Sequence, residues 1–420
     1  MVQDYIMSPR LQLYKYQEKY LEGLRKNCIM TCEVGLGKSA MALKHYEKYG
    51  ANKPLIIVAP ASKVRSLDWN KEVADWLPSM TPDQFSVVSY EGFTKNVDLL
   101  LDAGANSYAY IFDEVHYVKT PSSKRGKAFV KAVQTAHQWI GLSATPMSNG
   151  WQDTCNYAIA NGFVKNKTDF YRTYVVIVMQ RMGMRQFPKV AGYQNLKSLA
   201  QWWSHLSKPL SREGNLDLPK AIDRVKHIAM TDDASYEQAR LVRERIDAHN
   251  EPLDSSQKLM AALRNNLVEL REDSVRNILA STDENIIIFY NLNSERDLIL
   301  KMMKEKAHKH KKLYEQNGHA KTLPAHGQEP EKDGVLLIQY QSGSAGLNLQ
   351  YASVTIFLSP TYSYQNYHQA RGRTDRNGQT RTPVFYHIKV RSTVDTAIWE
   401  ALSKKQDFSE KAIDMNAFFE

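Results

Sequence analysis

A chain of 420 residues with 43% hydrophobic and 24% charged side chains is long enough for two or three globular domains. Its mean hydropathy of −0.50, and the lack of any apolar run near the roughly 20 residues of a membrane span, argue against a membrane partner. The first residues carry no signal-peptide pattern, and the three scattered cysteines suit a reducing cytoplasm. The net charge of +10 favours a polyanionic partner.

The first predicted strand covers residues 28–30 and leads into a glycine loop at residues 31–39. A helix-compatible segment follows, and this order is the context of a phosphate-binding P-loop, where backbone N–H groups and a helix N-terminus surround phosphate oxygens. Lys38 is placed to neutralise the β- and γ-phosphates and Ser39 to hold Mg²⁺. The expected nucleotide-binding residues of the loop are Gly35, Leu36, Gly37, Lys38 and Ser39. An ordinary helix-start loop is the alternative for this motif taken alone.

Further apolar strands are expected at residues 55–59, 86–89 and 108–112, and the last of these ends in Asp113 and Glu114. A carboxylate at the carboxyl end of a strand downstream of a P-loop is where nucleotide-bound Mg²⁺ needs a ligand, which we assign to Asp113. The adjacent Glu114 can polarise an attacking water. The alternative for an isolated Asp-Glu pair is a solvated turn.

A strand at residues 138–142 ends in Ser143-Ala144-Thr145, where small hydroxyl residues can connect a γ-phosphate sensor to a neighbouring surface. Strands that alternate with helices predict a parallel-sheet α/β lobe over residues 1–150. Residues 151–218 lose the strand pattern and predict a helical insertion packed on this lobe. We expect its tryptophan and tyrosine residues to pack in a core rather than to stack on bases, namely Trp151, Tyr157, Tyr171, Tyr174, Trp202 and Trp203.

A second α/β lobe with a helical lead-in is predicted over residues 219–405, followed by a tail at 406–420. Its strands are expected at residues 285–290, 335–339 and 354–358. Beyond them, Arg373 and Arg376 are three residues apart, which would make them neighbours on one helical face. Two guanidinium groups presented together suit a triphosphate, and a basic solvated helix is the alternative.

In this order, the P-loop, the Asp-Glu-x-His (DExH) box at residues 113–116 and the Ser-Ala-Thr motif resemble the first motor lobe of helicase superfamily two. The run from Gln369 to Gln379 resembles the arginine-finger motif of the second lobe. Details at residues 13–17, 60–69 and 393–398 resemble the Swi/Snf-like branch, and the compact versions carried by bacteriophages are the nearest resemblance.

The resemblance implies two RecA-like P-loop lobes that use ATP and Mg²⁺, with Gln17 reading the adenine base. It implies catalytic roles for Lys38, Asp113, Glu114, Gln369, Arg373 and Arg376 and nucleotide contacts for Gln17, Gly346, Arg373 and Arg376. Metal binding is implied for Ser39 and Asp113. The implied nucleic-acid contacts are Ser62, Lys63, Ser89, Tyr90, Lys119, Ser342, Gly343, Ser344 and Asn348.

These motifs predict an ATP hydrolase that translocates on duplex DNA with little sequence specificity. A helicase that unwinds forks or migrates branches is the first alternative, and a nucleotide-gated DNA clamp without translocation is the second. We expect double-stranded or forked DNA as partner and a monomeric chain in the cytoplasm, that of a bacterial host if the chain is phage-encoded. Residues that recruit a protein partner are not evident in the sequence.

Overall fold

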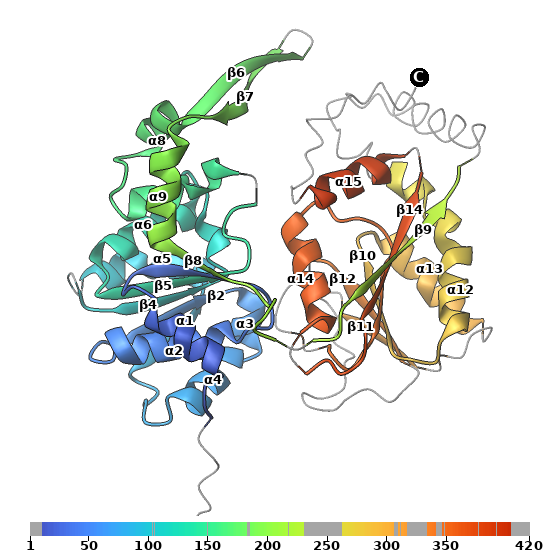
Figure 1. Ribbon diagram of the computed structural model, residues 1–420, viewed down its shortest axis with the longest axis horizontal. Coiled ribbons are helices and arrows are strands. Elements are labelled where there is room, and N and C mark those ends of the chain that lie inside the picture. The colour runs from blue at the N-terminus through green and yellow to red at the C-terminus, as the bar shows by residue number, and fades with distance from the viewer. Residues whose placement is uncertain are drawn as a thin grey trace, which may run out of the picture. The chain divides into compact units, whose positions relative to one another are not determined.

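The computed structural model (Figure 1) describes residues 11–102, 104, 106–148, 150–182, 185–216, 218–230, 263–305, 310, 312–316, 334–341, 347, 349–376, 378–391 and 393–404. The chain divides into two compact units, residues 1–216 (unit 1) and residues 217–420 (unit 2).

Unit 1 is built on a sheet of six described strands in the order β3-β2-β4-β5-β1-β8, and every pair is parallel. The strands are β1 (Cys28–Cys32), β2 (Leu55–Ala59), β3 (Phe85–Ser89), β4 (Ala109–Asp113), β5 (Gln138–Ser143) and β8 (Ser207–Leu210). β2, β4 and β5 are buried along their whole length, as expected for a parallel sheet that is covered on both faces.

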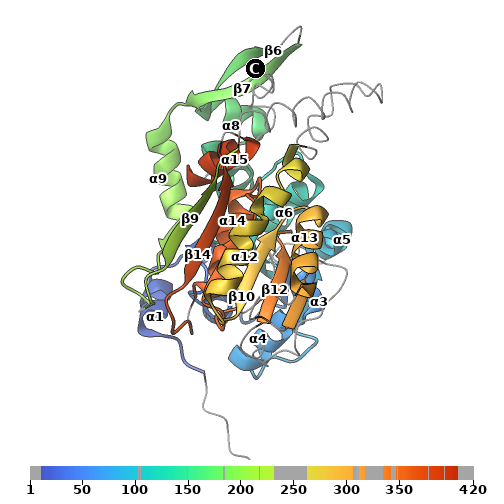
Figure 2. The same cartoon turned by 90° about the vertical axis from the view of Figure 1, so that its right-hand side faces the viewer.

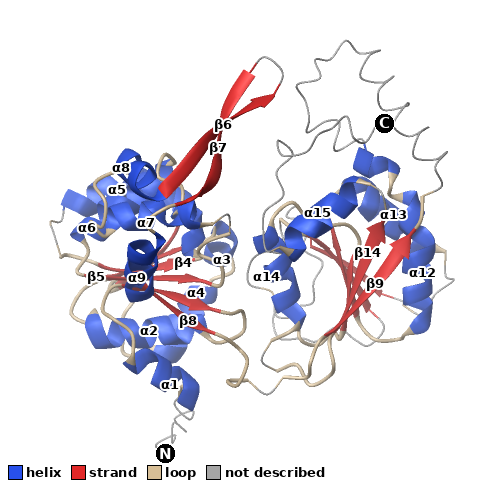
Figure 3. Ribbon diagram, turned by 45° about the horizontal axis from the view of Figure 1, so that its top comes forward, coloured by secondary structure: helices blue, strands red, loops and turns tan. Residues whose placement is uncertain are grey.

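Helices cover the two faces of this sheet (Figure 3). On one face, α1 (Lys15–Glu22), α2 (Lys38–Tyr49) and α4 (Asp68–Trp76) pack on alternate strand residues such as Ile57 and Ile111. On the other face, α5 (Tyr90–Asp102) and α6 (Lys124–Thr135) pack on the intervening residues, such as Val58 and Phe112. Two short elements, α3 (Ala61–Arg65) and η1 (Val115–Val118), follow β2 and β4.

The segment from residue 151 to β8 differs from the predicted helical insertion. It holds η2 (Trp151–Thr154), α7 (Cys155–Ala160), α8 (Lys167–Tyr174), β6 (Val175–Met182), β7 (Arg185–Tyr193) and α9 (Leu196–Leu206). β6 and β7 form an antiparallel hairpin, and β8 joins the main sheet beside β1. Four consecutive β-branched residues open β6, a strand preference that outweighed the helical pattern.

The six tryptophan and tyrosine residues singled out in this segment pack in cores, as predicted. They are Trp151, Tyr157, Tyr171, Tyr174, Trp202 and Trp203. Tyr157 is fully buried, with its ring centroid 6.1 Å from that of Phe129 on α6. These contacts fasten α7 and α9 to the sheet of unit 1.

Unit 2 contains a second sheet of six described strands in the order β11-β12-β10-β13-β14-β9, again all parallel. The strands are β9 (Ile222–Ile228), β10 (Ile286–Tyr290), β11 (Lys312–Gln316), β12 (Gly334–Gln339), β13 (Val354–Phe357) and β14 (Val384–Val390). The prediction of two RecA-like lobes with parallel sheets is therefore confirmed at the level of architecture.

Two layers of helices enclose the sheet of unit 2 (Figure 1). α14 (Tyr364–Thr374) and α15 (Val394–Ser403) cover one face, and α12 (Glu272–Ser281) and α13 (Asn293–Lys304) cover the other, with η3 (Glu269–Arg271) directly before α12. The strands supply both cores, because successive side chains of β10, such as Ile287 and Ile288, point to opposite faces.

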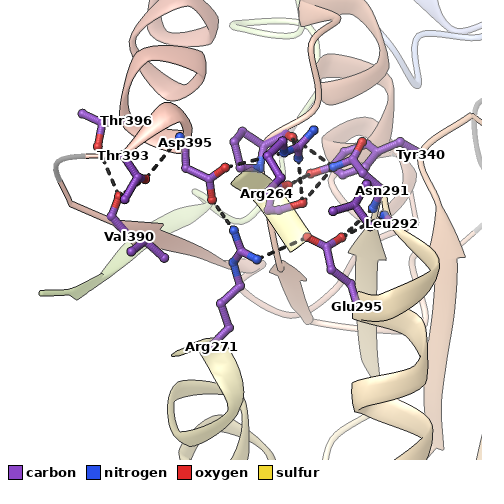
Figure 4. Close-up of polar contacts among 12 residues, drawn as sticks. Arg264, Arg271, Asn291, Leu292, Glu295, Tyr340, Val390, Thr393, Asp395 and Thr396 are labelled. Atoms are coloured by element: carbon purple, nitrogen blue, oxygen red, sulfur yellow. Dashed lines mark hydrogen bonds and ion pairs between the residues drawn. The ribbon is translucent and has the colours of Figure 1, made fainter. Parts of the chain in front are cut away.

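Four charged residues form a network in the interior of unit 2 (Figure 4). Arg271 pairs with Asp395 of α15 and, at 3.4 Å, with Glu295 of α13, and all three side chains are inaccessible to solvent. Arg264 lies 3.7 Å from the second oxygen of Asp395 and donates to the carbonyl oxygen of Pro360 at 2.6 Å. Because its charges are paired out of water, this network fixes α13 and α15 to the segment that precedes α12.

Candidate nucleotide-binding site

The glycine loop between β1 and α2 has the backbone geometry that a phosphate cradle requires. Gly35 and Gly37 have φ angles of +88° and +75°, in the left-handed region that favours glycine. α2 begins directly after the loop at Lys38, so its N-terminal N–H groups face the loop. A Cβ atom on Gly37 would lie 2.4 Å from the side-chain nitrogen of Gln17, which leaves no room for a side chain.

The lysine of this loop folds back onto its own backbone. Lys38 Nζ donates hydrogen bonds to the carbonyl oxygens of Cys32 at 3.0 Å and Glu33 at 3.2 Å. Burial lowers the pKa of Lys38, although the nearby Glu114 carboxylate acts in the opposite direction. These neutral carbonyl partners hold the ammonium at the loop and can be exchanged for phosphate oxygens.

Gln17, predicted to read adenine, is buried against the same loop. Its Nε2 donates to the carbonyl oxygen of Leu36 at 2.9 Å, and its Oε1 accepts a hydrogen bond from the Tyr14 backbone N–H at 2.9 Å. The Tyr16 hydroxyl donates to the same Leu36 oxygen at 3.3 Å. The start of α1 is thus fastened to the P-loop, while base reading by Gln17 stays a prediction.

Asp113 ends β4 and is 2% exposed. Its Oδ2 accepts hydrogen bonds from Lys63 Nζ at 2.6 Å and from Trp69 Nε1 at 3.0 Å. The Tyr90 hydroxyl donates to the Asp113 backbone oxygen at 2.8 Å. In this chain, therefore, an internal ammonium lies on the carboxylate that was predicted to hold Mg²⁺, which shows that the position suits a cation.

Glu114 has a φ of +53°, which is uncommon for a residue with a long side chain and typical of strained functional positions. Its Oε2 lies 3.3 Å from Nδ1 of His116, and the same nitrogen lies 3.2 Å from the Ser143 hydroxyl. Burial alone would raise the pKa of Glu114, but His116, Lys63 and Lys38 together lower this pKa to about 2. So weak a base suits the orientation of a water molecule better than the storage of its proton.

The Ser-Ala-Thr motif connects to the DExH box through this histidine. The Ser143 hydroxyl also accepts a hydrogen bond from the Thr145 backbone N–H at 3.1 Å. Through Ser143, the loop after β5 therefore contacts His116, which lies beside Glu114. Carboxylate and hydroxyl oxygens such as those of Asp113 and Ser39 are the ligands that Mg²⁺ prefers, so the donor set fits a magnesium nucleotide.

Three of the predicted nucleic-acid contacts have other partners in unit 1. Tyr90 is 1% exposed, so its side chain belongs to the core. Lys119 Nζ donates to Asp153 at 2.9 Å, and Lys63 contacts Asp113. Sequence alone missed these pairings because the partners are 34 and 50 residues away along the chain. Ser62 and Ser89 are partly exposed.

In unit 2, Gln369 and Arg373 lie on α14 and are 7% and 8% exposed. The expectation that Arg373 and Arg376 share a helical face is wrong. α14 ends at Thr374, and Asp375 leaves the helix with φ −88° and ψ 81°, so Arg376 lies beyond it. The predicted contacts Ser342, Gly343, Ser344, Gly346 and Asn348 lie outside the described residues.

Arg371, which the sequence did not single out, has a structural role. It pairs with Asp223 of β9 and lies over the ring of Phe385, 4.1 Å from its centroid. His387 Nε2 lies 2.9 Å from the same carboxylate. These contacts hold α14 against the edge of the sheet. An arginine in this motif therefore does not by itself indicate nucleotide binding.

Within the described ranges, no group of three or more His, Cys, Asp or Glu side chains gathers as a metal cluster. Among the helices described there, none combines the length and the apolar character needed to cross a membrane.

Comparison with known proteins identifies relatives of both units. Residues 269–378 match the helicase conserved C-terminal domain family. The human DNA annealing helicase and endonuclease ZRANB3 is 22% identical over 94% of this chain and 40% of its own length. The Drosophila melanogaster SWI/SNF-related matrix-associated actin-dependent regulator of chromatin subfamily A-like protein 1 is 22% identical over 92% of this chain and 54% of its own length.

The chain thus spans about half or less of the length of these curated relatives. The solved Sulfolobus solfataricus SWI2/SNF2 ATPase core in complex with dsDNA is 16% identical, with a TM-score of 0.43 over 94% of this chain and 91% of that chain. By sequence, the chain is similar along nearly its whole length to Swi/Snf-related helicases, and residues 269–378 match a helicase conserved C-terminal domain.

Proposed function

We propose that this chain is an ATP-dependent motor, a DNA-stimulated ATPase that translocates on duplex DNA with little sequence specificity. The observation that carries the proposal is the cluster at the carboxyl ends of β1, β4 and β5. There Lys38, Asp113 and Glu114 come from three separate motifs, and His116 links the last of them to Ser143. Phosphoryl transfer requires positioning and charge neutralisation, which such a cluster offers.

In this proposal Lys38 binds the β- and γ-phosphates, and Ser39 and Asp113 hold Mg²⁺. Bound Mg²⁺ neutralises phosphate charge. Glu114 orients the attacking water, and Gln17 contacts the adenine. In unit 2, the proposed nucleotide contacts are Gln369, Arg373, Arg376 and Gly346, and hydrolysis is proposed to change the affinity for DNA.

The phosphate contacts are expected to carry most of the affinity for DNA, because backbone binding needs no base code. The net charge of +10 supports a polyanionic partner. Partly exposed Ser62 and Ser89 remain candidates for phosphate contacts, together with the loop at residues 342–348. A monomeric state, a cytoplasmic location and a bacteriophage origin stay predictions, and the relatives named above come from cellular organisms.

The ATPase rate should be measured with duplex DNA, single-stranded DNA, RNA and no polymer over a series of salt concentrations. We expect the strongest stimulation by duplex DNA, and log affinity should fall with log salt with a slope of about −0.9 per neutralised phosphate. Far better stimulation by RNA would overturn duplex DNA as the partner. A chain that no nucleic acid stimulates at any salt concentration is not the proposed motor.

Translocation on duplex DNA and fork unwinding would both show DNA-stimulated ATP hydrolysis, so a second measurement is needed to distinguish them. Displacement of a triplex-forming strand without fork unwinding supports translocation, whereas unwinding of a fork or migration of a branch supports the helicase alternative. ATP-dependent DNA binding with neither activity supports the clamp. The name of the human relative, an annealing helicase, describes that protein and makes the fork substrates worth including.

A further inference from the structure

The β6–β7 hairpin exposes apolar side chains on both of its faces. Figures 1 and 2 both show it projecting from α8, away from the sheet of unit 1. Ile177 and Met179 are 45% and 58% exposed, and Val178 and Phe187 are each 46% exposed. Exposed apolar side chains that gather on one element commonly mark a binding surface.

Among the hairpin residues that the structure describes, those at its base are fastened to the core. Val175 is buried, and Val190 packs with the small cluster around Phe170 and Tyr174. Backbone and side-chain hydrogen bonds from Gln194 and Asn195 reach the carbonyl oxygens of residues 172–174 at 2.8 to 3.0 Å. A hairpin by itself is marginally stable in water. This anchoring therefore presents exposed apolar side chains on a supported element rather than leaving a loose loop.

The pairing register of β6 and β7 defines which side chains lie on each face of the hairpin. Val178 is opposite Lys189, and Phe187 lies two residues before Lys189 on β7, so these three side chains share one face. That face combines an exposed aromatic ring, an exposed aliphatic side chain and an exposed ammonium group. On the opposite face, Met179 and Pro188 face each other across the strands.

The charge of this region selects the partner. Residues 165–197 contain seven Lys and Arg side chains and one Asp, so this short segment carries +6 of the net +10 of the chain. A polyanion complements that charge. Exposed apolar side chains alone would not distinguish a nucleic acid from a protein partner, but the positive charge favours the nucleic acid. Aromatic and apolar side chains interleaved with basic ones are the chemistry that binds unstacked nucleobases and their phosphates.

We propose that the β6–β7 hairpin binds DNA at the junction between duplex and single strand, with Phe187 stacked on an exposed base and Lys189 on a nearby phosphate. The faces of the bases are hidden inside a continuous duplex, so the apolar side chains find partners only where stacking is interrupted. The inference rests on the proposed function only for the identity of the polymer, and it makes a fork or junction the preferred substrate of the motor.

The test compares Phe187→Ala, Phe187→Trp and Lys189→Ala with two control variants. Leu99→Ala removes an apolar side chain that is 70% exposed on α5, and Lys71→Ala removes an exposed ammonium on α4. All five variants change exposed side chains, so thermal melting should match the wild-type chain. Binding is measured by anisotropy on a labelled fork, with unlabelled fork or relaxed, covalently closed circular duplex as competitor.

Phe187→Ala should weaken fork binding at least about fivefold, and Lys189→Ala should weaken it less and reduce its salt dependence. Competition by closed circular duplex should change little. A 2-aminopurine beside the junction should be quenched by the wild-type chain and by Phe187→Trp but not by Phe187→Ala. The two control variants should behave as wild type.

Equal fork affinity and equal 2-aminopurine quenching in all variants would overturn the inference, even if duplex DNA stimulates the ATPase. Sedimentation that shows a dimer in the wild-type chain and a monomer in Phe187→Ala, with fork affinity unchanged, would instead assign the hairpin to a second copy. If DNA fails to stimulate the ATPase but fork binding depends on Phe187, the motor proposal fails and the junction site stands.

Discussion

The charged residues around Asp113 in unit 1 lie at the carboxyl end of a parallel sheet, whereas those around Asp395 in unit 2 are enclosed between helices. Lys63 and Glu114 keep 20% and 17% of their side-chain exposure, while Arg271, Glu295 and Asp395 keep none. A ligand can exchange for partners in the first cluster. In the second, every exchange would leave a charge buried, so that cluster is structural.

Removal of Arg271 should have the largest effect. Arg271→Ala leaves Asp395 and Glu295 buried without their shared partner, and we expect a loss of about 3–5 kcal/mol in the free energy of unfolding of unit 2. Arg276→Ala on the following helix, α12, is the matched control, since it breaks partly exposed pairs with Glu272 and Glu305, and such solvent-exposed pairs contribute little to stability. Urea unfolding of both variants measures the difference, and equal losses would contradict the comparison.

Lys38→Ala tests the exchangeable cluster. Because its partners are carbonyl groups of its own loop, we expect the fold to survive while the ATPase rate falls on the order of a hundredfold or more. Thermal melting and steady-state ATP hydrolysis of the purified variant separate the two effects. Near-normal turnover by a folded Lys38→Ala chain would remove the P-loop assignment.

Glu114→Gln should bind ATP almost normally and hydrolyse it far more slowly, so that the ATP-bound, DNA-binding state accumulates. The amide keeps the shape but loses the charge that His116 and the two lysines stabilise. Binding of a fluorescent ATP analogue and single-turnover hydrolysis should be measured side by side. Normal hydrolysis with weak nucleotide binding would mean that Glu114 acts in binding instead.

Lys63→Met should have the smallest effect, and it should improve nucleotide binding at low Mg²⁺ rather than impair function. Because its ammonium lies 2.6 Å from Asp113, we expect Lys63 to compete with Mg²⁺ for this carboxylate, so its loss should lower by a few fold the Mg²⁺ concentration needed for nucleotide binding. A Mg²⁺ titration monitored with a fluorescent nucleotide measures this, with Lys71→Met as an exposed control on α4. A higher Mg²⁺ requirement in Lys63→Met would show that Lys63 supports the metal rather than competing with it.

The local sequence predicted where the buried strands begin and end. β2 was predicted at its full extent, and β4, β5, β10 and β13 within one residue at each end, because buried parallel strands appear as continuous apolar runs. Asp113 and Ser143 stand at strand ends, so their placement at one edge of the sheet followed from the order of motifs. β9, β11 and β14 were missed, since β9 is largely exposed and all three lack a comparably clear apolar run.

The sequence by itself located the glycine loop, the carboxylates at the end of β4 and most of the buried strands, because each is a run of residues close together in the chain. Only the tertiary structure decided which partners Lys63 and Lys119 contact, that Arg376 lies outside α14, and that the hairpin projects with Phe187 exposed. Arg271 meets Asp395 across 124 positions. Pairings at such separations depend on how sheets and helices pack, and the local pattern around each residue carries no trace of them.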